Sequence, residues 1–157
     1  MIYSGELIKT CDISKLDESA YKNRFVGCIV LTNDNKILLQ QRGENWQNHP
    51  GYLSEFGGHI EANETPMQAL VRELNEELGA IVDASEVVSL GAVTEAMTSH
   101  SELIYVYFWH DKQGTITGCY EGEGKYYNTI NEALKHPKMM DSLRWLLHEC
   151  HRRNLIP

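Results

Sequence analysis

The stretch from Thr65 to Gly79 carries the start and stop signals of one helix, and it constrains the fold more than any other segment. Thr65 is a good N-cap, Pro66 suits the first helical position, and Gln68 completes a capping box. Gly79 is a typical C-terminal stop. A helix over residues 66–78 gathers its apolar side chains on one stripe, formed by Met67, Leu70, Val71, Leu74 and Leu78.

The segments around this helix predict a sheet. Apolar and β-branched runs predict strands over residues 25–31, 36–42, 52–56, 87–96, 103–110 and 115–120. Four apolar residues at helical spacing predict a second helix over residues 138–153: Met139, Leu143, Leu146 and Leu147. Strands around a central helix, closed by a late helix, predict an α/β (α+β) fold, a mixed sheet with helices on both faces. Since no repeat or Pro/Gly/Ser linker interrupts the chain, we expect one domain over residues 1–157.

Charge and hydropathy limit the partners of the chain. Its 157 residues include 14 Lys and Arg against 22 Asp and Glu, a net charge of −8 with neutral His. A surface this negative repels a phosphate backbone, so we expect no polymeric nucleic acid as a partner. A small phosphorylated ligand remains compatible, because a divalent cation can lie between acid and phosphate. No apolar run reaches the roughly 20 residues of a membrane span, so we expect no membrane partner.

The cysteines and the start of the chain bear on the compartment. Residues 1–12 lack the basic end and apolar stretch of a signal peptide. The four widely spaced cysteines could form two disulfides or remain thiols. Because nothing in the sequence points to export, we expect reduced thiols in a cytoplasmic protein. The four residues are Cys11, Cys28, Cys119 and Cys150.

Three carboxylates share one face of the predicted helix. At about 100° per residue, Glu76 lies roughly 60° to one side of Glu73 and Glu77 roughly 40° to the other. Like charges at these spacings destabilise a helix, and the macrodipole disfavours anions near its C-terminus. Arg72 relieves part of this repulsion, and a bound cation would relieve far more. Hard oxygen ligands without a nearby Cys or His favour Mg²⁺ or Mn²⁺.

A solvated helix face is the alternative explanation for an isolated ExxEE pattern. The surrounding sequence favours the metal site, because residues 55–77 hold six acids and one base. A partly enclosed segment this acidic is readily explained by bound cations.

The spacing of Gly58, Glu64, the run Arg72-Glu73-Leu74-Asn75-Glu76-Glu77 and Gly79 follows a known signature. From Gly58 to Ala80 the sequence resembles the Nudix box, which marks hydrolases that cleave nucleoside diphosphates linked to another group. Ala80 is smaller than the usual aliphatic residue at the last position, and Phe56 replaces a proline of many members. Neither difference removes a charged residue. The resemblance implies an α/β/α sandwich with the box helix and the C-terminal helix on opposite sides of the sheet.

The resemblance also implies a Mg²⁺- or Mn²⁺-dependent hydrolase in which a metal-activated water cleaves a phosphoanhydride bond. The implied metal ligands are the Gly58 carbonyl, Glu73, Glu76 and Glu77. Arg72 joins the catalytic set by orienting these carboxylates. The implied structural residues of the motif are Gly57, Glu61, Glu64 and Gly79.

The general base is left open by the sequence. In the family it is a box glutamate, here Glu73, Glu76 or Glu77, or a carboxylate further along the chain. Glu121 and Glu123 are candidates because they are predicted to follow a strand in a glycine-containing, flexible loop. Their alternative is an exposed surface turn. Glu95, at the end of a predicted strand, is a weaker candidate.

Three further residues are candidates for substrate binding. Trp46 is suited to stacking on a base, with Arg42 near a phosphate. The alternative for Trp46 is packing within a long loop. His59 occupies a variable position of the box, either at the surface or next to the substrate.

Markers outside the box narrow the substrate class. The sequence lacks those that the resemblance associates with ADP-ribose, dinucleoside polyphosphate, coenzyme A and NADH hydrolases. A nucleoside triphosphate or a nucleoside diphosphate derivative remains as the small-molecule substrate. The alternative is a non-catalytic Nudix-like module that senses a nucleotide, although such modules usually lose box glutamates. A homodimer is compatible with the sequence.

Overall fold

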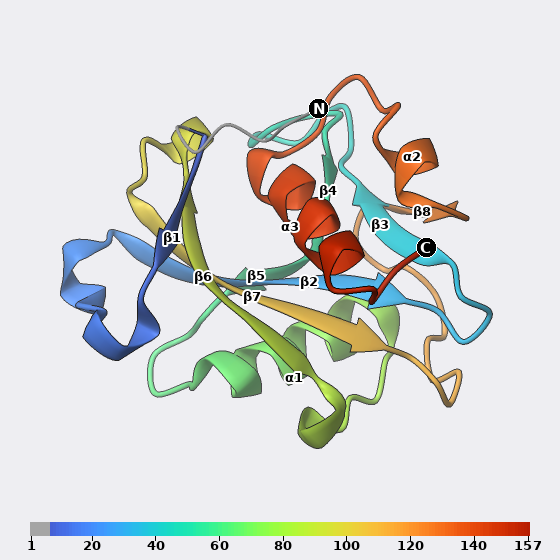
Figure 1. Cartoon of the computed structure of the whole chain (residues 1–157), viewed down its shortest axis with the longest axis horizontal. Helices are drawn as coiled ribbons and strands as arrows, with labels where there is room; N and C mark the ends of the chain where they lie inside the picture. Colours follow the sequence, from blue (N-terminus) through green and yellow to red (C-terminus); the bar gives the residue numbers. More distant parts are fainter. Residues whose placement is uncertain (1–6) are drawn as a thin grey trace.

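The computed structural model describes residues 7–157 of the chain (Figure 1). Its strands are β1 Ile8–Cys11, β2 Asn23–Leu31, β3 Ile37–Gln41, β4 Leu53–Ser54, β5 Phe56–His59, β6 Val88–Glu95, β7 Glu102–His110 and β8 Glu123–Tyr127. Its helices are α1 Pro66–Leu78, α2 Ile130–Ala133 and α3 Asp141–Arg152.

The strands form one mixed sheet around β2. The order is β1-β6-β7-β2-β3-β4, with β5 paired to β2 and β8 paired to β3. β2 runs parallel to β7, and every other pair is antiparallel. β3 and β5 pair with different parts of β2, at Val30–Leu31 and at Phe25–Cys28. The chain therefore changes partner strand between β4 and β5, at Glu55.

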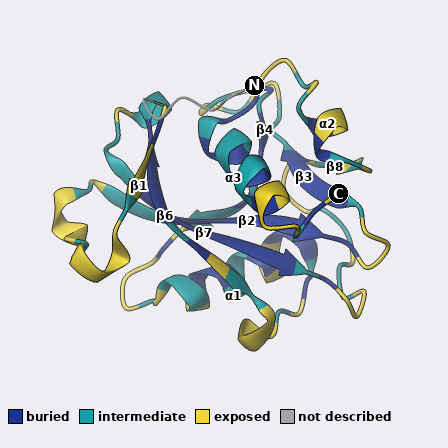
Figure 2. Ribbon diagram, in the orientation of Figure 1, coloured by how far each residue is buried: buried dark blue, intermediate teal, exposed yellow. Residues whose placement is uncertain are grey.

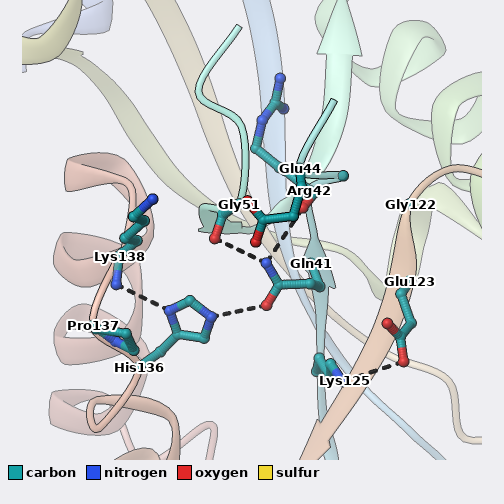
Figure 3. Close-up of a pocket in the computed structure, with 11 residues that line it drawn as sticks. Gln41, Arg42, Glu44, Gly51, Gly122, Glu123, Lys125, His136, Pro137 and Lys138 are labelled. Atoms are coloured by element: carbon teal, nitrogen blue, oxygen red, sulfur yellow. Dashed lines mark hydrogen bonds and ion pairs between the residues drawn. The ribbon is translucent and has the colours of Figure 1, made fainter. Parts of the chain in front are cut away.

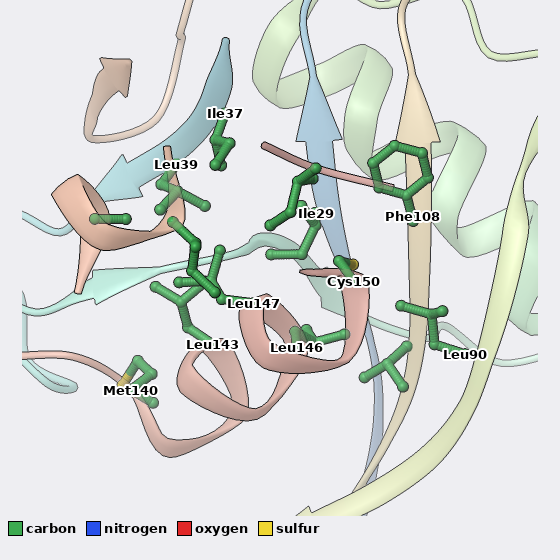
Figure 4. Packing of buried hydrophobic residues seen from close by; sticks show 14 of the residues in the cluster. Ile29, Ile37, Leu39, Leu90, Phe108, Met140, Leu143, Leu146, Leu147 and Cys150 are labelled. Carbon is green, nitrogen blue, oxygen red and sulfur yellow. The ribbon is translucent and has the colours of Figure 1, made fainter. Parts of the chain in front are cut away.

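Alternation of side chains along β2 divides the core into two layers. Val26, Cys28 and Val30 pack in the cluster that includes the apolar stripe of α1. Ile29 and Leu31 point to the opposite face, into the cluster that includes α3 (Figure 4). Both helices bury the side that meets the sheet and leave the other side accessible (Figure 2). This arrangement confirms the predicted sandwich, with the box helix and the C-terminal helix on opposite faces.

Local sequence signals set the ends of α1 as expected. Thr65 Oγ1 accepts the Gln68 N–H at 3.1 Å, and Gln68 Oε1 accepts the Thr65 N–H at 2.9 Å. At the other end Gly79 adopts φ 66°, and its N–H donates to the Asn75 carbonyl at 2.8 Å. These caps fix where the acidic side chains of α1 stand relative to the sheet.

The strand predicted over residues 115–120 is wrong. The N–H groups of Thr115 and Ile116 donate to the Asp111 carboxylate, and that of Tyr120 donates to the Glu77 carbonyl. The segment therefore binds a side chain and the end of α1 instead of a neighbouring strand. The strand forms later, as β8, so Glu123 opens a strand instead of following one.

The single strand predicted over residues 52–56 is instead two strands, β4 and β5, and the second runs through Gly57 and Gly58. Two other elements, β1 and α2, were not predicted. β1 is short, lies at the edge of the sheet and, among residues 7–157, pairs only with β6. α2 is a single turn, whose N-cap Thr129 accepts the Glu132 N–H at 3.3 Å. Both are too short to give a periodic signal in the sequence.

The four cysteines are free thiols, as expected. Over residues 7–157, no helix is long and apolar enough to cross a membrane. The signal-peptide expectation depends largely on residues 1–6, which lie outside the described part. The single domain over residues 1–157 stays a prediction.

Removing a large side chain beneath α3 tests the layered core. Leu146 is fully buried in the α3 layer. We expect Leu146→Ala to lower the free energy of unfolding by about 2–5 kcal/mol, because the cavity is not refilled. The exposed Ile81 is the control, and Ile81→Ala should change the free energy by about 0.5 kcal/mol or less. Chemical denaturation followed by circular dichroism measures both, and equal effects would contradict the assigned packing.

Candidate active site

Arg72 is the centre of the charged face of α1. Its Nε and Nη2 donate to both oxygens of Glu64, at 2.7 and 2.9 Å, in a bidentate pair. Nη2 also donates to the His59 carbonyl at 3.0 Å. Nη1 donates to Glu73 at 2.8 Å and lies 3.4 Å from Glu76. One guanidinium therefore ties the loop before α1 to the acids on α1.

Glu61 and Glu64, in the loop before α1, help to hold the Arg72 guanidinium in place. Hydrogen bonds from Arg72 and from the Glu61 N–H lower the pKa of Glu64 to about 2, so its carboxylate stays charged. The Glu61 side chain is itself exposed and lies 3.9 Å from Arg72. Glu61 thus contributes mainly its backbone, whose N–H donates to Glu64 at 2.9 Å.

Glu77 is a buried acid, 2% exposed, that faces the backbone of β5. Its Oε2 accepts the Gly57 N–H at 3.1 Å. Burial, followed by the charges of Glu73 and Glu121, raises the pKa of Glu77 to about 9. In the absence of a cation, this carboxyl therefore holds a proton at neutral pH.

The two box glycines allow β5 to approach these acids. Gly57 has φ 153°, and a Cβ there would lie 2.0 Å from the Val26 carbonyl oxygen. A Cβ on Gly58 would lie 2.5 Å from the Glu73 carboxyl carbon. A side chain at Gly57 would push β5 away from β2, and one at Gly58 would displace the Glu73 carboxylate.

The box residues fit a hard divalent cation by their chemistry. Glu73, Glu76 and Glu77 are 12%, 59% and 2% exposed, and the Gly58 backbone lies against Glu73. All offer oxygen donors, which Mg²⁺ and Mn²⁺ prefer. Within the described residues, no three acids, histidines or cysteines already converge as an ion cage. Binding a cation thus requires these carboxylates to draw together, and Glu73 and Glu76 to adjust their contacts with Arg72.

A pocket of about 510 Å³ opens beside the box. Gly57, Gly58, Glu77 and Glu121 all line it. The Glu121 carboxylate makes no hydrogen bond or ion pair within residues 7–157, and its charge raises the pKa of both Glu73 and Glu77. The structure therefore brings Glu121 together with the box acids.

Glu123 lies elsewhere, in a separate pocket of about 660 Å³ (Figure 3). Its carboxylate is 68% exposed and pairs with Lys125 at 3.2 Å. Gly122, with φ 69°, turns the chain between Glu121 and Glu123. The two acids that the sequence grouped as base candidates are thus separated, and only Glu121 faces the box.

The predicted substrate-binding residues are dispersed. Arg42 lines both pockets, donates to the Asn48 and His49 carbonyls, and stands 4.7 Å above the Trp46 ring. Trp46 does not line the pocket beside the box. His59 is exposed and stacks on Phe25 at 4.6 Å between ring centroids.

Comparison with known proteins identifies the family. The chain matches the family model of the NUDIX domain over residues 22–148. It belongs to the Nudix family. It is 35% identical over 111 residues to the CTP pyrophosphohydrolase of Escherichia coli K12. The aligned region covers 69% of this chain and 77% of that protein.

Solved structures of other proteins share the Nudix fold. The MutT protein of Methanosarcina mazei Go1 superposes with a TM-score of 0.64 at 20% identity, over 88% of this chain and 99% of that one. A bifunctional NMN adenylyltransferase/ADP ribose pyrophosphatase of Francisella tularensis, complexed with AMP and a Mn ion, gives a TM-score of 0.61 at 18% identity. That match covers 83% of this chain and 41% of the other.

These findings confirm the resemblance read from residues 58–80. Nudix hydrolases act on acid anhydrides, and the relatives are named pyrophosphohydrolases and diphosphatases, so the chain is a hydrolase of this class. The cytoplasmic location, the homodimer and the absence of a nucleic-acid partner stay predictions.

Sequence reasoning missed three residues of the Nudix pocket as a group. Ser142, at the start of α3, donates through Oγ to Glu55 at 3.2 Å and through its N–H to Glu95 at 2.9 Å. From the sequence, Glu55 is only one of the six acids of residues 55–77, and Glu95 is only a weaker candidate for the general base. Their one visible signal is an acid within or at the end of an apolar strand.

The stability of the protein is expected to depend on Glu95 between pH 4.5 and about 7. Burial, followed by the charge of Glu55, raises the pKa of Glu95 from 4.5 to about 7. Below pH 4.5 the carboxyl is protonated in the folded and unfolded chain alike. Between pH 4.5 and 7 unfolding releases its proton, so its contribution to the free energy of unfolding declines as pH rises and is lost above about pH 7.

Urea denaturation at several pH values compares the parent chain with Glu95→Gln. The variant is expected to lose this part of the pH dependence, because glutamine does not titrate. Identical pH dependence in both proteins would show that Glu95 titrates normally.

Proposed function

We propose that the protein is a Mg²⁺- or Mn²⁺-dependent hydrolase that cleaves a phosphoanhydride bond in a nucleoside triphosphate or a nucleoside diphosphate derivative. The observation that carries the proposal is the buried Glu77 carboxyl, which lines the pocket together with Glu121 and forms no ion pair within residues 7–157. The names of relatives support the substrate class, since one is a CTP pyrophosphohydrolase and another an 8-oxo-dGTP diphosphatase.

The proposed cation ligands are the Gly58 carbonyl, Glu73, Glu76 and Glu77. A solved neighbour with the same fold is complexed with a Mn ion, which supports a divalent cation as the cofactor. When bound, the divalent ion supplies positive charge to the phosphate oxygens and makes water a better nucleophile. Arg72 restrains the acids: it fixes Glu73 directly while Glu64 holds the guanidinium from the other side.

Glu121 is the proposed general base. Its carboxylate lines the pocket and has no partner among residues 7–157, so an oxygen is free to accept a proton from the attacking water. The acids of α1 are less suited, since a carboxylate that holds a cation is a poor base. Arg42 reaches the same pocket and is placed to neutralise a phosphate.

Removing the divalent cation should stop turnover, and removing one of the carboxylates proposed to bind it should strongly reduce turnover. We expect phosphate release from a panel of nucleotides to require Mg²⁺ or Mn²⁺ and to stop in EDTA. Glu77→Gln should lower kcat by on the order of 10²-fold or more, because it removes charge stabilisation from the site. The exposed Glu86 is the matched control, and Glu86→Gln should turn over at the parent rate. Binding of nucleotide without hydrolysis under any condition would favour the sensor alternative.

The two acids around Gly122 offer a matched pair. Glu121→Gln should lower kcat by about 10²–10⁴-fold with little change in Mg²⁺ affinity, because a base acts on the proton and not on the ion. Glu123→Gln should leave kcat unchanged, since Glu123 pairs with Lys125 away from the pocket. Steady-state kinetics with a Mg²⁺ titration measures both. Parent-like turnover in Glu121→Gln would return the role of base to Glu73 or Glu76.

A further inference from the structure

The pocket beside the box contains a second pair of carboxyl groups that the proposed reaction does not use. Glu55 lies where the chain passes from β4 to β5, and Glu95 is the last residue of β6. Ser142 of α3 links them, through its hydroxyl to Glu55 and its N–H to Glu95. All three residues line the same pocket as Gly58 and Glu77. Three separate parts of the fold therefore meet to hold two acids at one place.

Among the described residues, this pair of acids has no directly bonded basic side chain. Within residues 7–157, neither Glu55 nor Glu95 forms an ion pair. Burial raises the pKa of Glu55, and hydrogen bonds from its own backbone and from Ser142, with the more distant charge of Arg42, offset this only in part. Asp141 and Glu55 both disfavour ionisation of Glu95. Burying two acids without a counter-charge is unfavourable unless hydrogen bonds or a ligand offset the loss of water. Ser142 supplies one such bond to each acid, so further donors or acceptors from a ligand would be favourable.

The backbone around the pair is strained and tightly held. Ser99 and His100, in the turn between β6 and β7, have φ values of 54° and 55°. Such conformations are unfavourable for residues with a Cβ and persist only where the surroundings impose them. Here the His100 N–H donates to the Glu95 carbonyl at 2.9 Å, and its ring contacts Thr94 Oγ1 at 2.8 Å. The strained turn thus fixes Glu95 at the pocket.

A glycine makes room for the other acid. A Cβ on Gly27 of β2 would lie 3.1 Å from Glu55 Oε2. Gly27 itself lines the pocket, so the Glu55 carboxyl lies over bare backbone there. The position of Glu55 is therefore also built into the sheet.

We propose that Glu55 and Glu95 select the nucleobase by binding an edge that carries a ring nitrogen acceptor beside an exocyclic amino group, as in cytosine and adenine. Glu95 donates its carboxyl proton to the ring nitrogen, and Glu55 accepts a hydrogen bond from the amino group. The inference rests on the proposed function, because it assumes that this pocket takes a nucleotide. The raised pKa of Glu95 agrees with its role as the donor. The pocket has a volume of about 510 Å³, which falls within the usual range of about 300–1,000 Å³ for small-molecule sites.

Uracil and hypoxanthine present the opposite edge, an oxo group beside a ring N–H. Their oxo group would face the Glu55 carboxylate, and their N–H would face the proton of Glu95. Each mismatch leaves a carboxyl group of the pocket unpaired, and unpaired polar groups of this kind give strong discrimination between ligands.

Binding of nucleoside monophosphates to the full chain tests the inference without requiring turnover. Calorimetry compares CMP with UMP and AMP with IMP, which differ only by amino against oxo groups. We expect the amino member of at least one pair to bind about 10-fold tighter or more. In Glu95→Met and Glu55→Met this ratio should fall close to one. Glu95→Gln should retain most of it, because an amide still offers one donor and one acceptor.

Glu102→Met is the matched control, since Glu102 lines the pocket without contacting Ser142 and its loss should leave the ratio unchanged. Circular dichroism establishes that each variant is folded. No amino preference, a ratio insensitive to both methionine variants, or tightest binding of GMP, whose edge offers two donors, would overturn the inference. A protein that hydrolyses nucleotides but shows one of these results retains the proposed function, whereas selective binding without any hydrolysis retains the inference alone.

Discussion

The guanidinium of Arg72 is the interaction on which the geometry of the site depends. α1 brings Glu73, Glu76 and Glu77 to one face, and without a nearby positive charge their repulsion would favour rotamers that separate them. Arg72 counteracts this at Glu73 and Glu76 and is itself anchored by the bidentate contact with Glu64. The same guanidinium donates to the carbonyl of His59 at the end of β5, at 3.0 Å, so it also holds β5 and its glycine pair beside the acids. The loop and the helix are therefore positioned as one unit.

The parts of the fold that the sequence predicts well are those decided by local contacts. The capping box of Thr65 and the stop at Gly79 involve residues within a few positions of each other, and α1 begins and ends as expected. The segment 115–120 has the composition of a strand, but Asp111 and the end of α1 take its backbone donors. That outcome depends on where α1 lies relative to β7, which no local pattern encodes.

The same distinction applies to the site. The acids on α1 follow from helical periodicity and from the box, and the structure places them on one face. Glu121 and Glu123 are equivalent in sequence, and only the turn at Gly122 separates them into two pockets. Glu55, Glu95 and Ser142 come from three distant segments, so their meeting depends on the partner change of β4 and β5 and on the docking of α3. Local sequence patterns do not predict contacts between segments that are this far apart in the chain.

The pocket therefore joins two acidic groups with different physical origins. On α1, the internal cation Arg72 holds Glu73 and Glu76, whereas Glu77 lines the pocket and accepts the Gly57 N–H. The oxygens of these acids suit an exchangeable hard ion. Glu55 and Glu95 have only the hydroxyl and N–H of Ser142, with no ion pair in the described chain. A planar ligand with a donor and an acceptor would satisfy both acids. The two groups of acids thus suit different roles in one cavity of about 510 Å³: the acids of α1 suit the reacting phosphates, and Glu55 and Glu95 suit recognition of the base.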